Sequence, residues 1–260
     1  MNYEEIIIYS LVQGITEFLP ISSSAHLLFL ENIFTWQING RTSAIAAHLG
    51  TLIAVILYLK KDFINLNINI YRFYNNKLII NLVVATIPII LVGLLIFKNL
   101  DSELLNLRVT AMASILGGII LYWADSIKKS NNKKLENLSI LQAFIIGIFQ
   151  IFALIPGTSR AGAVITGARF MKLNRTEATK MGLFTGIPTI SAAVVLEFSW
   201  LINNYKNMDL FLLIIITLLS CAFSIIAIKL LIIWVRNKSF LPFVIYRVLL
   251  GIIILFYISS

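Results

Sequence analysis

The chain has 260 residues, of which 59% are hydrophobic and only 13% are charged. Soluble domains carry about 25% charged residues, so this composition excludes an ordinary soluble fold. The formal net charge is +9, but the basic residues lie in short blocks between apolar runs. That distribution excludes nucleic acid as a partner and fits contacts with lipid headgroups. Several apolar runs approach the roughly 20 residues that span a bilayer, which indicates a single, polytopic membrane domain over residues 1–260.

The first apolar segment is interrupted by polar side chains and a proline. Residues 6–19 are apolar except for three polar positions, and Pro20 ends any helix there. A second short helix is expected from Ser22 to about Leu30. Each half is too short to cross a bilayer. We therefore predict a re-entrant helix–loop–helix element over about residues 6–30.

The rest of the chain holds a second broken segment and six candidate spans. A Pro-Gly break at residues 156–157 divides an apolar segment, so a second re-entrant element is expected at about 139–170. Residues 63–76 are Asn-rich and amphipathic, which predicts an interfacial helix. The spanning helices are expected at about residues 43–59, 78–97, 109–123, 178–200, 210–234 and 242–258.

The distribution of basic residues supports this topology. Most lie in four short segments, at residues 60–77, 125–137, 169–180 and 236–238. The positive-inside rule places these segments in the cytoplasm. Both ends of the second broken segment then lie inside, as a re-entrant element requires, while residues 1–42 lie outside. The two re-entrant elements would enter from opposite faces.

A short sequence pattern recurs in the two elements. Aligned on proline, PISSSA at residues 20–25 matches PGTSRA at 156–161. Gln13 lies seven residues before the first proline, and Gln150 six before the second. Similar elements that enter from opposite faces are typical of an inverted-topology repeat. The predicted fold is therefore an all-α polytopic membrane protein with six transmembrane helices and two re-entrant elements in an inverted repeat.

The first element carries ionisable side chains that are costly at membrane depth and therefore indicate a functional site. Gln13 and Glu17 share one helix face. Glu17 could act as a general base or bind a divalent cation, or it could be a structural carboxylate paired with an arginine. Ser23 could be a nucleophile activated by His26, or His26 could move protons while the hydroxyls only bind oxygen. The neighbouring hydroxyls cap a helix or bind the same anion: Ser22 and Ser24.

The second element offers complementary groups. Gly157 allows close backbone approach, Thr158 and Ser159 supply hydroxyls, and Arg160 has a planar fork suited to phosphate. The helix that begins here favours an anion at its N-terminus.

Elsewhere, three polar residues receive structural interpretations. His48 is interpreted as a packing histidine, with a place at the border of the site as the alternative. Tyr246 and Arg247 are interpreted as an interfacial anchor.

These motifs resemble the bacterial undecaprenyl-diphosphate phosphatases, the family linked to bacitracin resistance. QGITEFLPISSSAH at residues 13–26 is similar to its (Glu/Gln)-x-x-x-Glu box and the following Pro-x-Ser-Ser-x-x-His. PGTSRAG at 156–162 is similar to its Pro-Gly-x-Ser-Arg-Ser-Gly box, and FVIYRVLLG at 243–251 to its C-terminal Tyr-Arg element. This chain departs from the family pattern at Gln13, where many members have glutamate. The glutamine removes one possible metal ligand.

The resemblance implies an enzyme that dephosphorylates undecaprenyl diphosphate and so recycles the lipid carrier for peptidoglycan. It implies a multi-pass protein of the bacterial cytoplasmic membrane with an outward-facing site, and a divalent cation, Mg²⁺ or Ca²⁺, held by Glu17. Glu17, Ser23, His26 and Arg160 would be catalytic. The residues expected to bind the substrate are Gln13, Ser22, Ser24, Gly157, Thr158 and Ser159.

The sequence leaves alternatives open for the oligomeric state and for the function. A homodimer is an alternative to a monomer. The rival function is a transporter or flippase of polyprenyl phosphate or an ion, because inverted repeats with broken helices are transporter architecture.

Overall fold

The computed structural model describes residues 3–34, 40–65, 76–97, 106–127, 134–204 and 209–259. Within these ranges the chain is helical and contains no strand, so the predicted all-α class is confirmed. The helices are α1 (Tyr3–Thr16), α2 (Ser23–Ile33), α3 (Gly40–Asn65), α5 (Lys77–Phe97), α6 (Leu107–Ser126), α7 (Ile140–Ile151), α8 (Arg160–Phe170), α9 (Arg175–Asn204), α10 (Leu210–Asn237) and α11 (Leu241–Tyr257). Two 3₁₀ turns, η2 (Leu135–Asn137) and η3 (Phe152–Leu154), flank α7.

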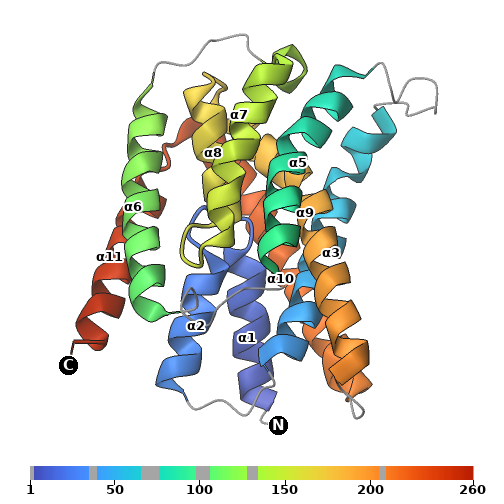
Figure 1. Cartoon of the computed structure of the whole chain (residues 1–260), viewed down its shortest axis with the longest axis vertical. Coiled ribbons are helices and arrows are strands. Elements are labelled where there is room, and N and C mark those ends of the chain that lie inside the picture. The colour runs from blue at the N-terminus through green and yellow to red at the C-terminus, as the bar shows by residue number, and fades with distance from the viewer. Residues whose placement is uncertain are drawn as a thin grey trace.

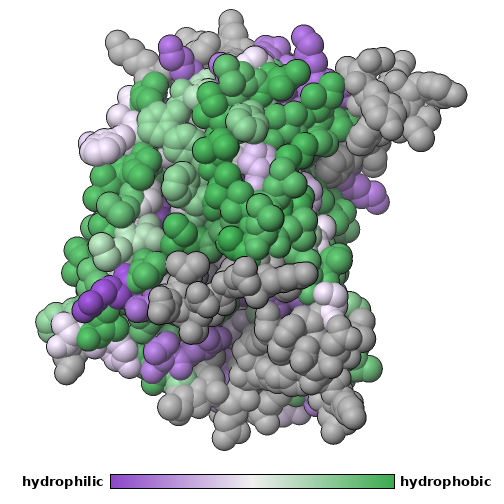
Figure 2. Space-filling model, viewed as in Figure 1, coloured by the Kyte–Doolittle hydropathy of each residue, from purple (hydrophilic) through white to green (hydrophobic). Residues whose placement is uncertain are grey.

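Five helices are long and apolar enough to cross a membrane: α3, α5, α6, α9 and α10. They match five of the six predicted spans. The sixth predicted span corresponds to α11, a shorter apolar helix of 17 residues. Figure 2 shows a broad hydrophobic region over the middle of one face, with hydrophilic residues gathered at the upper end. Most of the predicted interfacial helix at 63–76 lies outside the described residues, and residues 63–65 continue α3.

Two short helical hairpins enter the molecule from opposite ends. Figure 1 shows α1 and α2 at the lower end and α7 and α8 at the upper end, with both connecting loops near mid-height. Neither hairpin helix is long enough to cross a bilayer, because α1 has 14 residues and α2, α7 and α8 have 11 or 12. The longer helices surround the hairpins and carry most of the apolar surface.

A single shift in residue number relates the two halves of the chain. Residue 23, where α2 begins, corresponds to 160 in α8, and its end at 33 corresponds to 170, a shift of 137 at both ends. The same shift brings α1 onto α7 with η3, α3 onto α9, α5 onto α10, and α6 onto α11. Packing repeats in the same way, since α10 lies against α1 as α5 lies against α7. The chain is thus built from two structurally equivalent halves.

The structural alignment of the two halves differs by one residue from the sequence alignment on proline. The structure pairs Ser22 with Ser159, because each caps a short helix with φ near +70° (71° and 68°). This register also pairs Gln13 with Gln150, which the proline alignment left one residue apart. The prolines are displaced because the two loops take different paths into the same cap.

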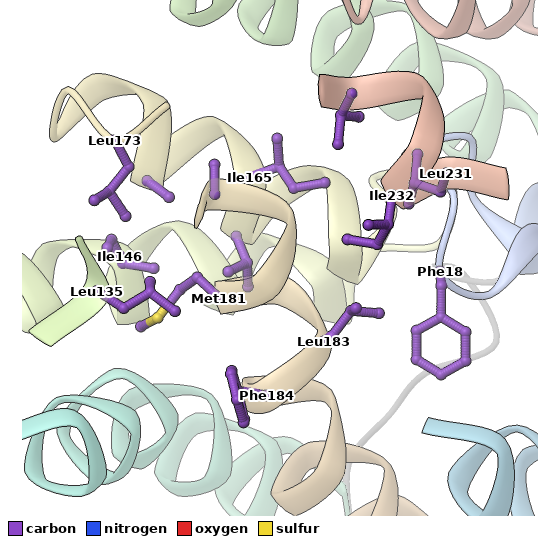
Figure 3. Packing of buried hydrophobic residues seen from close by; sticks show 14 of the residues in the cluster. Phe18, Leu135, Ile146, Ile165, Leu173, Met181, Leu183, Phe184, Leu231 and Ile232 are labelled. Atoms are coloured by element: carbon purple, nitrogen blue, oxygen red, sulfur yellow. The ribbon is translucent and has the colours of Figure 1, made fainter. Parts of the chain in front are cut away.

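The loop between α1 and α2 is anchored in the main hydrophobic core. Phe18 is 1% exposed and belongs to the same cluster as Leu183 of α9 and Leu231 of α10. Figure 3 shows its ring among these helices, at the edge of the packed side chains of α7, α8 and α9. Burial of this ring fixes the position of the residue beside it, Glu17.

We expect Gly14→Ala to lower the thermal unfolding midpoint of the detergent-solubilised protein. A Cβ on Gly14 would lie 2.7 Å from Phe223 Cβ and 2.8 Å from the Ser220 carbonyl oxygen, so α1 and α10 would have to separate. Such overpacking costs about 1–3 kcal/mol. Gly93→Ala is the matched control, because its added Cβ has an ordinary contact of 3.6 Å with Leu154. Equal midpoints for the two variants would contradict this account of the packing.

Candidate active site

The loops of the two hairpins are hydrogen-bonded to each other at the centre of the molecule. The Gly157 amide donates to Ser24 Oγ at 3.2 Å, and Ser159 Oγ donates to the Leu19 carbonyl at 3.4 Å. The second loop therefore donates both bonds, and the first loop accepts them. Side chains that are 140 residues apart in sequence are held in one place.

Both hairpins present a helix N-terminus at this junction. Ser22 Oγ accepts from the Ala25 amide at 3.4 Å and begins α2, while Ser159 Oγ accepts from the Gly162 amide at 3.1 Å and begins α8. The first turn of a helix carries unpaired N–H groups and a partial positive charge. Two such termini at one junction favour an anion there.

Glu17 is the carboxylate at the centre of the junction, and its side chain is almost fully buried. Its Oε1 accepts from Arg160 Nη2 at 3.0 Å, across the two hairpins. Its Oε2 accepts from Gln13 Nε2 at 3.0 Å and from Ser23 Oγ at 2.9 Å. A buried carboxylate requires such partners, because an unpaired charge is strongly destabilising.

Arg160 is held in a fixed orientation by three groups. Its Nη1 donates to the Gly182 carbonyl of α9 at 2.8 Å, and its guanidinium lies 5.6 Å from the centre of the Phe18 ring. A Cβ at Gly186 would lie 2.7 Å from Nη1, so a glycine is needed on this face of α9. The ion pair with Glu17 completes the set. The planar fork is therefore preorganised before any ligand arrives.

The ion pair lies at the polar end of a pocket of about 530 Å³. Glu17, Ser23 and Arg160 line this end, together with Ser22, Ser24 and Ser159. The remaining wall is mostly apolar and comes from α5, η3 and α9: Ile89, Ile90, Gly93, Leu94, Ile96, Ala153, Leu154, Thr189, Ile190, Ala192, Ala193, Val195, Leu196 and Glu197. The shape and lining suit an amphiphile with a small anionic head and an apolar tail.

His26 is not among the residues that line this pocket. Its Nδ1 is 2.7 Å from the Ser22 carbonyl, which can only accept, so Nδ1 donates. Its Nε2 then accepts from the Tyr246 hydroxyl at 2.6 Å, and the two rings are stacked. The structure therefore brings together Glu17, Ser23 and Arg160, but it does not place His26 with them. The predicted proton transfer by His26 stays a prediction, and its observed contact is with the backbone that caps α2.

His48 is the histidine that faces the pocket. Its Nδ1 bonds the Ala44 carbonyl at 2.8 Å, and its Nε2 lies 3.9 Å from Glu17 Oε2. The side chain is 35% exposed and forms part of the pocket wall. Of the two interpretations of His48, packing is therefore wrong, and the structure places the residue at the border of the site. The signal that could have found it is the cost of an ionisable group in the middle of a span.

The interpretation of Arg247 as an interfacial anchor is also wrong, because the residue is fully buried. Its Nη2 donates to the carbonyls of Thr158 at 2.7 Å and Gly157 at 3.2 Å. Together with Tyr246, which reaches the first loop through His26, it connects α11 to both loops. Sequence reasoning missed this role because the two residues lie almost 90 positions from the nearer loop. Thr158 and Gly157 thus contribute backbone groups to the junction.

Around Glu17 the ligands for a resident divalent cation are incomplete. Mg²⁺ and Ca²⁺ take six or more oxygen ligands. Among the described residues no group of three or more His, Cys, Asp or Glu side chains could hold a metal ion. The groups directed at the carboxylate are an amide NH₂, a hydroxyl and a guanidinium, which are hydrogen-bond donors. The residues around Glu17 therefore do not form a site that could hold a divalent cation with protein ligands alone.

The fold and the pocket define a class of protein. This is a multi-pass helical membrane protein with a buried ion pair at the centre and a mostly apolar pocket that continues from it. The chain belongs to a known family, since the family described as bacitracin resistance protein BacA matches residues 6–253.

Similar proteins extend over almost the whole chain. One named undecaprenyl-diphosphatase, from Pelagibacter ubique, is 40% identical over 97% of this chain and 96% of its own length. Others with the same name are 36% identical in Saccharophagus degradans, over 96% of each chain, and 32% identical in Alteromonas mediterranea, over 100% of each chain.

We expect Ser159→Ala to destabilise the protein more than Ser159→Gly. Both changes remove the cap of α8 and the bond to Leu19, a loss of about 1 kcal/mol for the cap. Alanine would also have to adopt φ near 68°, which costs a residue with a Cβ about 1–2 kcal/mol more. The measurement is thermal unfolding in detergent. Equal destabilisation by the two changes would argue against strain at this cap.

Proposed function

We propose that this chain is a phosphatase that hydrolyses undecaprenyl diphosphate to undecaprenyl phosphate and inorganic phosphate. The observation that carries the proposal is the ion pair of Glu17 and Arg160 at the polar end of an apolar pocket. The names of similar proteins, which extend over the same length, support the same reaction. In the cell this step recycles the lipid carrier for peptidoglycan, and the family's description as bacitracin resistance protein links it to bacitracin resistance.

The polar end of the pocket suits the diphosphate head of a polyprenyl diphosphate, and its apolar wall suits the prenyl chain. Arg160 and the amides at the starts of α2 and α8 bind the diphosphate, because a guanidinium fork and helix N-termini both favour phosphate oxygens. The prenyl chain lies along the apolar residues of α5 and α9.

Chemistry at the site begins with the hydroxyl of Ser23. Its hydrogen bond of 2.9 Å to Glu17 Oε2 is the arrangement of a nucleophile with its base. Ser23 Oγ forms a bond to the terminal phosphorus while the bond from that phosphorus to the bridging oxygen breaks, and the electron pair leaves with the lipid monophosphate. The hydroxyl proton passes to Glu17. The oxygen of a water molecule then bonds to the phosphorus of the phosphoserine while the bond from phosphorus to Ser23 Oγ breaks. Glu17 returns its proton to Oγ, and inorganic phosphate leaves with the protons of the water.

The proposed membrane arrangement has six spanning helices, with α11 as the sixth, and two re-entrant hairpins in an inverted repeat. It is supported by the shift of 137 residues and by hairpins that enter from opposite ends (Figure 1). Basic residues lie near the helix ends on the side from which the second hairpin enters, namely the C-terminal ends of α3 and α10 and the N-terminal ends of α7 and α9: Lys60, Lys61, Arg236, Lys238, Lys134 and Arg175. The positive-inside rule assigns this end to the cytoplasm. The pocket wall on α5 continues toward the opposite end, so the site faces outward in the bacterial cytoplasmic membrane.

We expect Glu17→Gln and Arg160→Lys each to reduce phosphate release from undecaprenyl diphosphate by at least about 100-fold, the order of magnitude for loss of a general base or a preorganised charge. The amide cannot accept the serine proton. The lysine keeps its charge but loses the fork that reaches both Gly182 and the phosphate. The assay uses purified protein in detergent, with gel filtration to show that each variant is folded. Full turnover by both variants would contradict the assignment of this site.

His48→Ala should raise the KM for the lipid more than it lowers kcat, because the imidazole lines the pocket beside the phosphate end. Tyr246→Phe is the comparison: it removes the hydroxyl bond to His26, outside the pocket, and keeps the ring. We expect it to lower kcat with little change in KM, through a less ordered first loop.

A wild-type protein that releases no phosphate but moves labelled lipid across liposomes would favour the rival flippase.

A further inference from the structure

The Glu17 carboxylate is surrounded by hydrogen-bond donors rather than by oxygen ligands. Gln13, Ser23 and Arg160 all donate to it, at 3.0, 2.9 and 3.0 Å. Arg160 already supplies one positive charge in direct contact. A cation that bound the same carboxylate would have to displace or repel the guanidinium. The position from which a cation would neutralise Glu17 is therefore occupied by the Arg160 guanidinium.

The orientation of Gln13 is determined by the same carboxylate. Its NH₂ group donates to Glu17 Oε2, and its own Oε1 points elsewhere, buried and without a hydrogen-bond partner. Turning the amide over would place two acceptor oxygens together, which is unfavourable. Gln13 thus presents a donor to the site. A glutamate at this position would present a second carboxylate, about 3 Å from the first by the present contact.

We infer that Gln13 makes cation binding in this chain depend on the substrate: Arg160 neutralises Glu17 in the free protein, and a divalent cation enters only on the diphosphate. The inference rests on the proposed function, because it needs a diphosphate as ligand. Mg²⁺ is commonly held by one or two carboxylates together with substrate phosphates, and it keeps several waters. A single carboxylate beside two phosphates meets that requirement, whereas a single carboxylate alone does not.

The test compares binding of Mn²⁺, as a spectroscopic probe, to purified wild type and Gln13→Glu in the absence of substrate. Two facing carboxylates repel each other unless a cation lies between them, and ligand charge governs affinity. Equilibrium dialysis with electron paramagnetic resonance should give an affinity at least about tenfold higher for Gln13→Glu, in line with the tuning of such sites by ligand charge. Equal affinities would overturn the inference.

Gln150→Glu is the matched control in the other half of the chain. Gln150 occupies the position equivalent to Gln13, is fully buried, and also has an unpartnered Oε1, but its NH₂ donates to the Ala85 carbonyl at 3.0 Å. No carboxylate receives its bond. The same change of charge there should not increase Mn²⁺ affinity. An increase as large as that of Gln13→Glu would show that added charge alone explains the effect, and would overturn the inference.

A second measurement needs no variant, in case Gln13→Glu does not fold. Wild type should retain Mn²⁺ in dialysis only when a non-hydrolysable methylene-diphosphonate analogue of a prenyl diphosphate is bound. Retention without the analogue, at the affinity measured with it, would overturn the inference. Phosphate release by wild type tests the proposed function separately. A protein that releases phosphate and also binds Mn²⁺ alone would refute only the inference about Gln13.

Discussion

The ion pair between Glu17 and Arg160 is the interaction on which the centre of this protein depends. It joins two hairpins that enter from opposite ends, and within the described part of the chain neither charge has another charged partner as close. A buried charge without its partner is strongly destabilising, so the pair requires both loops to be present and correctly oriented. The two hydrogen bonds that the second loop donates to Ser24 and Leu19, together with the buried ring of Phe18, maintain that orientation. Binding geometry and folding are therefore set by the same contacts.

The polar junction is supported by a third element, far away in sequence. α11 contributes Arg247 to the carbonyls of the second loop and Tyr246 to His26, which holds the carbonyl of Ser22 in the first. Short loops with residues at positive φ are strained and persist only when their surroundings determine them. The helix thus stabilises two strained caps with two adjacent side chains. These carbonyls explain how Arg247 is fully buried although no carboxylate among the described residues pairs with it.

The two halves share a backbone plan but differ in chemistry. The equivalent of Ser23 in the second half is Arg160, and the equivalent of Glu17 is Leu154, under the shift that relates α2 to α8. One half therefore supplies the carboxylate and hydroxyl, and the other supplies the guanidinium. A repeat of this kind places complementary groups at one point because each hairpin ends at the same depth. Asymmetry of the residues, on a symmetric scaffold, creates the site.

Sequence alone determined the all-α membrane class, both broken segments, and the residues Glu17, Ser23 and Arg160, because apolar run length, proline breaks and the cost of charge at membrane depth are local properties. Three features were decided only by the tertiary structure. The register of the repeat follows from backbone conformation at Ser22 and Ser159 rather than from proline. The placement of His48 in the pocket and of His26 outside it depends on which face of each helix packs inward. The burial of Arg247 depends on contacts nearly 90 residues away, and no local pattern carries that information.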